Sequence, residues 1–108
     1  MRQALREPTT VIDIHICGDG FAIHKVLQEY CETGFCISIM PCGYIYTGGA
    51  ESGWLVRIIN YPRFPEPYDK LKTRAISLAD KMLEALGQSS CSIVCPDETI
   101  YLQIKEKP

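Results

Sequence analysis

The sequence predicts an α+β protein in which an antiparallel sheet carries two helices on one of its faces. Three observations support this fold class: a strictly alternating apolar stretch opens the chain, two amphipathic stretches have helical spacing, and β-rich stretches lie between and after them. The length of 108 residues is typical of a single domain. We expect one domain over residues 9–105, preceded by a flexible segment over residues 1–8.

The first expected strand covers residues 9–17 and alternates strictly between its two sides. The residues that share one side are Ile12, Ile14 and Ile16. Side chains at every second position of a strand point to the same face, and β-branched residues favour strands. We expect the isoleucine side to face the core, which leaves Asp13 and His15 on the opposite face of the sheet.

A helix is expected next, because apolar residues over 23–31 recur at offsets typical of an amphipathic helix. Asp19, in the tight turn before it, is a suitable N-cap residue. The second strand starts at Phe35 and resumes after Pro41 up to Tyr46. Because proline cannot donate a ladder hydrogen bond, this strand should lie at a sheet edge or carry a bulge.

The middle of the chain is interpreted as a hairpin whose glycine-rich loop covers residues 48–53, followed by a third strand over 54–61. A proline-rich connector leads to a second helix, which begins near Tyr68 and ends at Gly87. Two short strands about a turn are then expected over residues 90–104.

This order, β-α-β-β-α-β with room for an extra C-terminal strand, is the ferredoxin-like split arrangement. Two helices then cover one face of an antiparallel sheet, and the first and third strands lie side by side in the middle. We therefore expect Asp13, His15 and Arg57 to be neighbours on the face without helices. Such a trio could hold a polar ligand or transfer a proton. The alternative is a solvated cross-strand pair between Asp13 and Arg57.

Composition and charge argue against several classes of protein. The net charge of −2 gives no basic footprint for nucleic acid, so we expect no nucleic-acid partner. No apolar run is long enough to span a membrane, and we therefore expect a cytoplasmic protein. The six cysteines form no Cys-x-x-Cys motif and are interpreted as reduced core residues, with disulfides or a metal site as the alternatives. No metal site and no cofactor are predicted.

A second candidate ligand site is the hairpin loop with its flanking aromatic residues. Tyr44, Tyr46 and Trp54 could stack on a planar ring, while Glu51 could bond to hydroxyl or amine groups. Arg63, on the rigid proline-rich connector, would add a fixed cation. The alternative is a simple hairpin turn beside aromatic core residues.

The leading functional interpretation is a small non-enzymatic binding protein without catalytic residues. It would hold a small polar, nucleotide-like ligand near the hairpin over residues 44–63 or at a subunit interface. Leu55 and Ile59 on the open face favour a homo-oligomer. Two alternatives remain: a protein-binding inhibitor or adaptor of the viral or mobile-element accessory type, and a small enzyme that uses His15 with Asp13.

Overall fold

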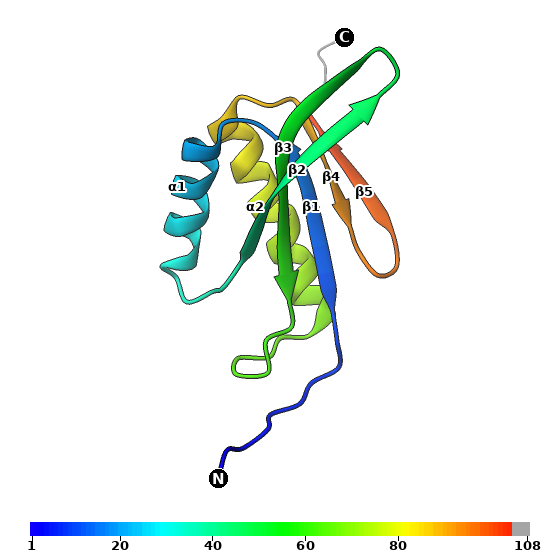
Figure 1. Cartoon of the computed structure of the whole chain (residues 1–108). Coiled ribbons are helices and arrows are strands. Elements are labelled where there is room, and N and C mark those ends of the chain that lie inside the picture. The colour runs from blue at the N-terminus through cyan, green and yellow to red at the C-terminus, as the bar shows by residue number, and fades with distance from the viewer. Residues whose placement is uncertain (105–108) are drawn as a thin grey trace.

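The structure is a computed structural model and describes residues 1–104 of the chain. It contains a five-stranded antiparallel sheet with the strand order β2-β3-β1-β4-β5, and both helices lie on the same side of it (Figure 1). The elements are β1 (Val11–Cys17), α1 (Gly20–Cys31), β2 (Ser38–Tyr46), β3 (Gly49–Ile59), α2 (Tyr68–Leu86), β4 (Ser90–Val94) and β5 (Thr99–Gln103). The predicted α+β class, with an antiparallel sheet and two helices, is confirmed.

The hydrophobic core lies between the helices and one face of the sheet. The three isoleucines of β1 are at most 1% exposed, and so are Val56 and Ile58 on β3, which pairs with β1. The helices contribute buried apolar side chains at helical spacing, and these are Ile23, Leu27, Leu71, Ala75, Leu78, Ala79, Met82 and Leu83. The alternating pattern of β1 therefore assigns its isoleucine side to the core, as expected.

The helix ends follow the capping residues in the sequence. The Asp19 carboxylate accepts a hydrogen bond from the backbone N–H of Ala22 at 3.0 Å, which satisfies one of the free donors at the start of α1. Helix α2 ends where Gly87 adopts a left-handed conformation with φ of 65°. The backbone N–H groups of Gly87 and Gln88 then donate to carbonyls of the last turn.

The predicted loop over residues 48–53 is wrong, because β2 and β3 continue to pair as far as Tyr46 and Gly49. The turn consists of Thr47 and Gly48 alone, and Gly48 supplies the positive φ of 86° that such a tight turn needs. Strand β1 ends at Cys17, opposite Gly53, so the hairpin tip projects beyond the rest of the sheet as a two-stranded ribbon (Figure 1).

Strand β2 lies at the edge of the sheet, as the proline in its middle predicts. Pro41 pairs in register with Trp54, and the neighbouring residues keep the same register on both sides. The strand therefore passes through the proline without a bulge.

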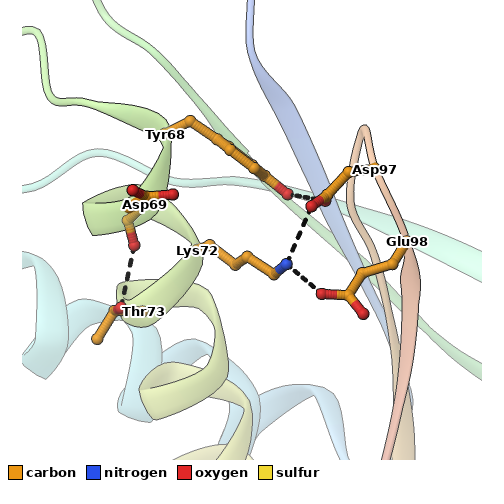
Figure 2. A network of polar contacts seen from close by, with 6 residues as sticks. All are labelled: Tyr68, Asp69, Lys72, Thr73, Asp97 and Glu98. Carbon is orange, nitrogen blue, oxygen red and sulfur yellow. Dashed lines mark hydrogen bonds and ion pairs between the residues drawn. The ribbon is translucent and has the colours of Figure 1, made fainter.

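A polar network joins the turn between β4 and β5 to the first turns of α2 (Figure 2). The Tyr68 hydroxyl donates to Asp97, while Lys72 forms ion pairs with Asp97, at 3.3 Å, and with Glu98. The Tyr68 hydroxyl and the Lys72 ammonium hold the pKa of Asp97 below its ordinary value. This network fixes the β4–β5 hairpin against the helical layer.

Candidate functional site

The face of the sheet without helices (Figure 1) is called the open face below. It contains a cavity of about 340 Å³. Its polar and aromatic lining comes from four strands and consists of His15, Cys17, Tyr44, Ser90, Ser92 and Tyr101. The volume lies at the lower end of the range of small-molecule sites, roughly 300–1,000 Å³. Two tyrosine side chains, an imidazole and two serine hydroxyls thus surround a space large enough for a small ligand.

His15 and Tyr44 are in direct contact at one wall of this cavity. The His15 Nδ1 atom lies 3.1 Å from the Tyr44 hydroxyl oxygen, and the two rings meet edge to face with centroids 5.7 Å apart. The same hydroxyl donates to the backbone carbonyl of Trp54 at 3.1 Å. The pKa of Tyr44 is raised well above its ordinary value, mainly by burial and in second place by the neighbouring Cys42. This phenol therefore stays protonated at neutral pH.

The contact between Tyr44 and His15 depends on the absence of a side chain at Gly53. A Cβ atom there would lie 2.8 Å from Cε2 of the Tyr44 ring and 2.5 Å from the backbone oxygen of Ile16. The Tyr44 ring therefore lies over the Gly53 backbone and reaches from β2 across β3 to β1. The sequence pattern assigns Gly53 to a loop. In the structure it lies in a strand, and its missing side chain leaves room for the Tyr44 ring to contact His15.

Glu51 lies opposite Tyr44 in the β2–β3 register and accepts a hydrogen bond from the Tyr46 hydroxyl at 2.9 Å. Hydrogen bonds from Cys17 and Tyr46 lower the pKa of Glu51, so the carboxylate is ionised. The pKa of the Cys17 thiol is raised to about 11, mainly by burial and in second place by its hydrogen bond to Glu51. The hydrogen bond to Glu51 also raises the pKa of Tyr46. Two neutral donors thus hold one negative charge beside the cavity, because Cys17 also lines it.

The expected trio of Asp13, His15 and Arg57 is divided into two separate contacts. Arg57 forms a two-pronged ion pair with Asp13, in which Nε and Nη2 lie 2.8 Å and 3.0 Å from the two carboxylate oxygens. The two residues are directly opposite in the β1–β3 register, which explains the pairing. Their charges compensate each other, and His15 is hydrogen-bonded to Tyr44 instead.

Trp54 and Arg63 do not join Tyr44, Tyr46 and Glu51. Trp54, Val56 and Ile58 occupy alternate positions of β3 and therefore share one face of the sheet. Because Val56 and Ile58 are buried in the core, the Trp54 ring also lies on the helix side. There its Nε1 donates to the carbonyl of Gly18 at 3.3 Å.

Arg63 is exposed in the turn that follows β3, whereas the hairpin tip precedes β3. The eleven residues of that strand separate the two ends by about 30 Å or more, at roughly 3.3 Å per residue. The Arg63 guanidinium therefore lies too far away to act together with the hairpin.

Sequence reasoning did not identify the cavity wall that β4 and β5 contribute. Ser92 lies directly opposite His15 on β4, and Tyr101 lies opposite Ser92 on β5. The signal was available in principle, because the expected strand order places the fourth strand next to the first, and alternation then selects these positions. Short serine-containing strands, however, carry little chemical signature of their own.

Within residues 1–104, no group of three or more His, Cys, Asp and Glu side chains is arranged to hold a metal ion. Among the same residues, neither helix combines the length and the apolar character that crossing a bilayer requires.

No protein-family model and no curated protein sequence matches this chain. Two solved structures do match it across almost its whole length. A phage SAM lyase in the apo state has a TM-score of 0.65 at 12% identity, and the match covers 97% of this chain and 100% of that one. A phage SAM lyase in complex with S-methyl-5′-thioadenosine has a TM-score of 0.61 at 11% identity, with 96% of each chain covered. At this identity, the likeness shows a shared fold.

The matched proteins are enzymes, and this corrects the expectation of a non-enzymatic binding protein. The finding favours the alternative of a small enzyme. The expectation assigned no catalytic residue to the chain, but an active site need not contain a recognisable short motif. The structure also separates Asp13 from the partnership with His15 on which the enzyme alternative was based.

Proposed function

We propose that this chain is a small lyase that acts on S-adenosylmethionine (SAM) or a closely related sulfonium nucleoside. The observation that carries the proposal is the open-face cavity, in which aromatic rings, hydroxyls and an imidazole converge beside an ionised carboxylate. The likeness to the phage SAM lyases supports the choice of substrate class, because one of them binds S-methyl-5′-thioadenosine.

The cavity lining suits the nucleoside part of such a substrate. Tyr44 and Tyr101 present aromatic surface on which a purine ring could stack. Ser90, Ser92 and His15 supply groups that can bond to ribose hydroxyls or to the edge of the base. A mostly apolar pocket with a few fixed polar groups is the usual design of a small-molecule site.

Glu51 suits the sulfonium group, which carries a positive charge. Among residues 1–104, no Lys, Arg or His forms an ion pair with Glu51, so its charge is available to a ligand. The Tyr44 ring beside it adds the attraction of an aromatic face for a cation. A neutral thioether would lack both interactions, and we therefore expect the sulfonium form to bind more tightly than the product.

The reaction requires cleavage of the bond between sulfur and the aminocarboxypropyl carbon. The electron pair of this bond returns to sulfur, which becomes the neutral thioether of S-methyl-5′-thioadenosine. Because a lyase adds no water, the four-carbon fragment either closes into a ring through its own carboxylate or forms a double bond and loses a proton. The positive charge disappears as the bond breaks, so Glu51 contributes to binding and selectivity rather than to stabilising the transition state.

We also propose a ferredoxin-like topology for the sheet and association with a second copy of the chain. The strand order β2-β3-β1-β4 supports a ferredoxin-like topology extended by β5. Leu55 and Ile59, which are half-buried on the open face, support association with a second copy of the chain.

The test is incubation of the purified protein with SAM, followed by chromatography and mass spectrometry of the products, with a protein-free blank for spontaneous breakdown. We expect S-methyl-5′-thioadenosine together with a four-carbon product that contains no added water. Glu51→Gln should raise the KM for SAM by roughly tenfold or more, because the ionic contact with the bound sulfonium is lost. Arg63→Ala, at the far end of the molecule, is the matched control and should leave turnover unchanged. Product formation at the rate of the blank would refute the proposal.

A further inference from the structure

We infer that Tyr44 holds the His15 ring in the tautomer that carries its proton on Nδ1, and that Nε2 is thereby the hydrogen-bond acceptor of the open-face cavity for an O–H or N–H group of the ligand. The inference about the ligand rests on the proposed nucleoside site. The inference about the ring is independent of it.

The Tyr44 hydroxyl contacts both the Trp54 carbonyl and the His15 ring. A phenol carries one proton, and this one is donated to the Trp54 carbonyl, which can only accept. The phenol remains protonated at neutral pH because burial raises its pKa. The contact of its oxygen with His15 Nδ1, at 3.1 Å, must therefore be made by a proton on the imidazole. Neutral imidazole has a single N–H group, so Nε2 keeps its lone pair.

His15 lines the cavity, and within residues 1–104 its Nε2 atom makes no hydrogen bond. No Lys or Arg lines the cavity, so no fixed cation competes for this lone pair. The other polar groups of the lining are hydroxyls, which both donate and accept, and the Cys17 thiol, which stays protonated because burial raises its pKa to about 11. Among the side chains of residues 1–104 that line the cavity, the imidazole is the one that can only accept toward the ligand.

A ligand that covers Nε2 without donating to it would take this acceptor out of water unpaired, which costs free energy. A ligand that offers N–H or O–H at this position is therefore preferred over one that offers only a lone pair. A nucleoside has two such sources, the ribose hydroxyls and the exocyclic amine of adenine. Both present the same chemistry to His15, and an experiment can separate them.

The tautomer can be measured directly by ¹⁵N NMR of imidazole-labelled protein, at an alkaline pH where the spectrum no longer changes and both rings are neutral. His24, the second histidine of the sequence, is an internal reference. Its Nδ1 lies 2.6 Å from the Gly20 carbonyl, so it must also carry its proton on Nδ1. We expect both rings to show the Nδ1–H pattern. Tyr44→Phe should shift His15 toward a mixture of tautomers and leave His24 unchanged.

Binding is tested by calorimetry with S-methyl-5′-thioadenosine and two substitutions of His15. In His15→Asn, the amide can replace Nδ1 and its contact with Tyr44, whereas in His15→Gln it can reach the position of Nε2. We expect His15→Asn to lose roughly five- to tenfold in affinity and His15→Gln to retain most of it. Analogues that lack the 2′- or 3′-hydroxyl, and the 6-oxo analogue that lacks the amine, identify the donor, because its removal should abolish the difference between the two variants.

The outcomes separate the two proposals. An Nε2–H pattern for His15 in the unchanged protein overturns the inference, even if the nucleoside binds. Equal affinities of His15→Asn and His15→Gln also overturn it. An Nδ1–H pattern for His15, together with product formation from SAM at the rate of the protein-free blank, supports the inferred state of the ring and refutes the proposed function.

Discussion

The two faces of the sheet differ sharply, although the same strands build both of them. Ile14 is fully buried between Val56 and Ile93, its partners on the two neighbouring strands. The next residue, His15, is only half-buried, and its partner on β4 is Ser92 at the wall of the cavity. The alternation of a strand thus separates packing in the core from the lining of the cavity at a spacing of one residue. Substitutions at adjacent positions should therefore have very different effects.

The largest effect is expected from Ile14→Ala. Removal of the buried methyl and methylene groups leaves a cavity among fully packed neighbours and should lower the free energy of unfolding by about 2–5 kcal/mol. The matched control is His15→Ala, which loses one contact with Tyr44 and should cost about 1 kcal/mol or less. Urea denaturation measures both. Losses of similar size at the two positions would contradict the separation of the faces.

A smaller effect is expected from Gly53→Ala, which tests whether the open face is packed as closely as the helix face. The added methyl group would meet the Ile16 backbone oxygen at 2.5 Å, and backbone cannot move aside as a flexible side chain can. We expect a loss of about 1–3 kcal/mol in urea denaturation. Gly43→Ala is the control, because nothing lies within 4 Å of a Cβ atom there. Equal stabilities of the two variants would show that the Tyr44 ring is not packed on Gly53.

The smallest effect concerns the network that joins the two layers at the turn between β4 and β5 (Figure 2). Because the folded state lowers the pKa of Asp97 below the ordinary value of 3.8, its carboxylate adds stability above that pH and loses this contribution as the pH falls through the lowered value. Asp97→Asn should therefore be less stable than the unchanged protein at pH 7, and the gap should narrow in acid. Urea midpoints measured against pH test this.

The exposed Glu29 of α1 offers a control for general charge effects, as Glu29→Gln. A gap between Asp97→Asn and the unchanged protein that does not depend on pH would contradict the role of the ionised carboxylate.

The fold was predictable because its determinants are local. The alternation of Ile12, Ile14 and Ile16, the cap at Asp19 and the stop at Gly87 each act over a few residues, and the structure shows each of them in place. The hairpin was predicted less well. Its glycines indicate a loop by composition, whereas the paired backbone extends β3 back to Gly49.

The site was predictable only in part, because its contacts cross several strands. Alternation places Asp13 and His15 on the open face, and it could also have placed Trp54 on the helix side with Val56 and Ile58. The contact of His15 with Tyr44 has no such local signal. It requires an aromatic side chain to extend across β3 over a residue that lacks a Cβ atom, and this depends on the register of three strands at once.

The ribbon at the tip of β2 and β3 has a mechanical consequence. Residues 43–46 pair only with residues 49–52, and no third strand supports them. A two-stranded element in water is marginally stable on its own and bends more easily than a full sheet. The backbone of Tyr44, Tyr46 and Glu51 therefore belongs to a ribbon that we expect to bend more easily than the five-stranded part of the sheet, where the isoleucine layer is held by core packing.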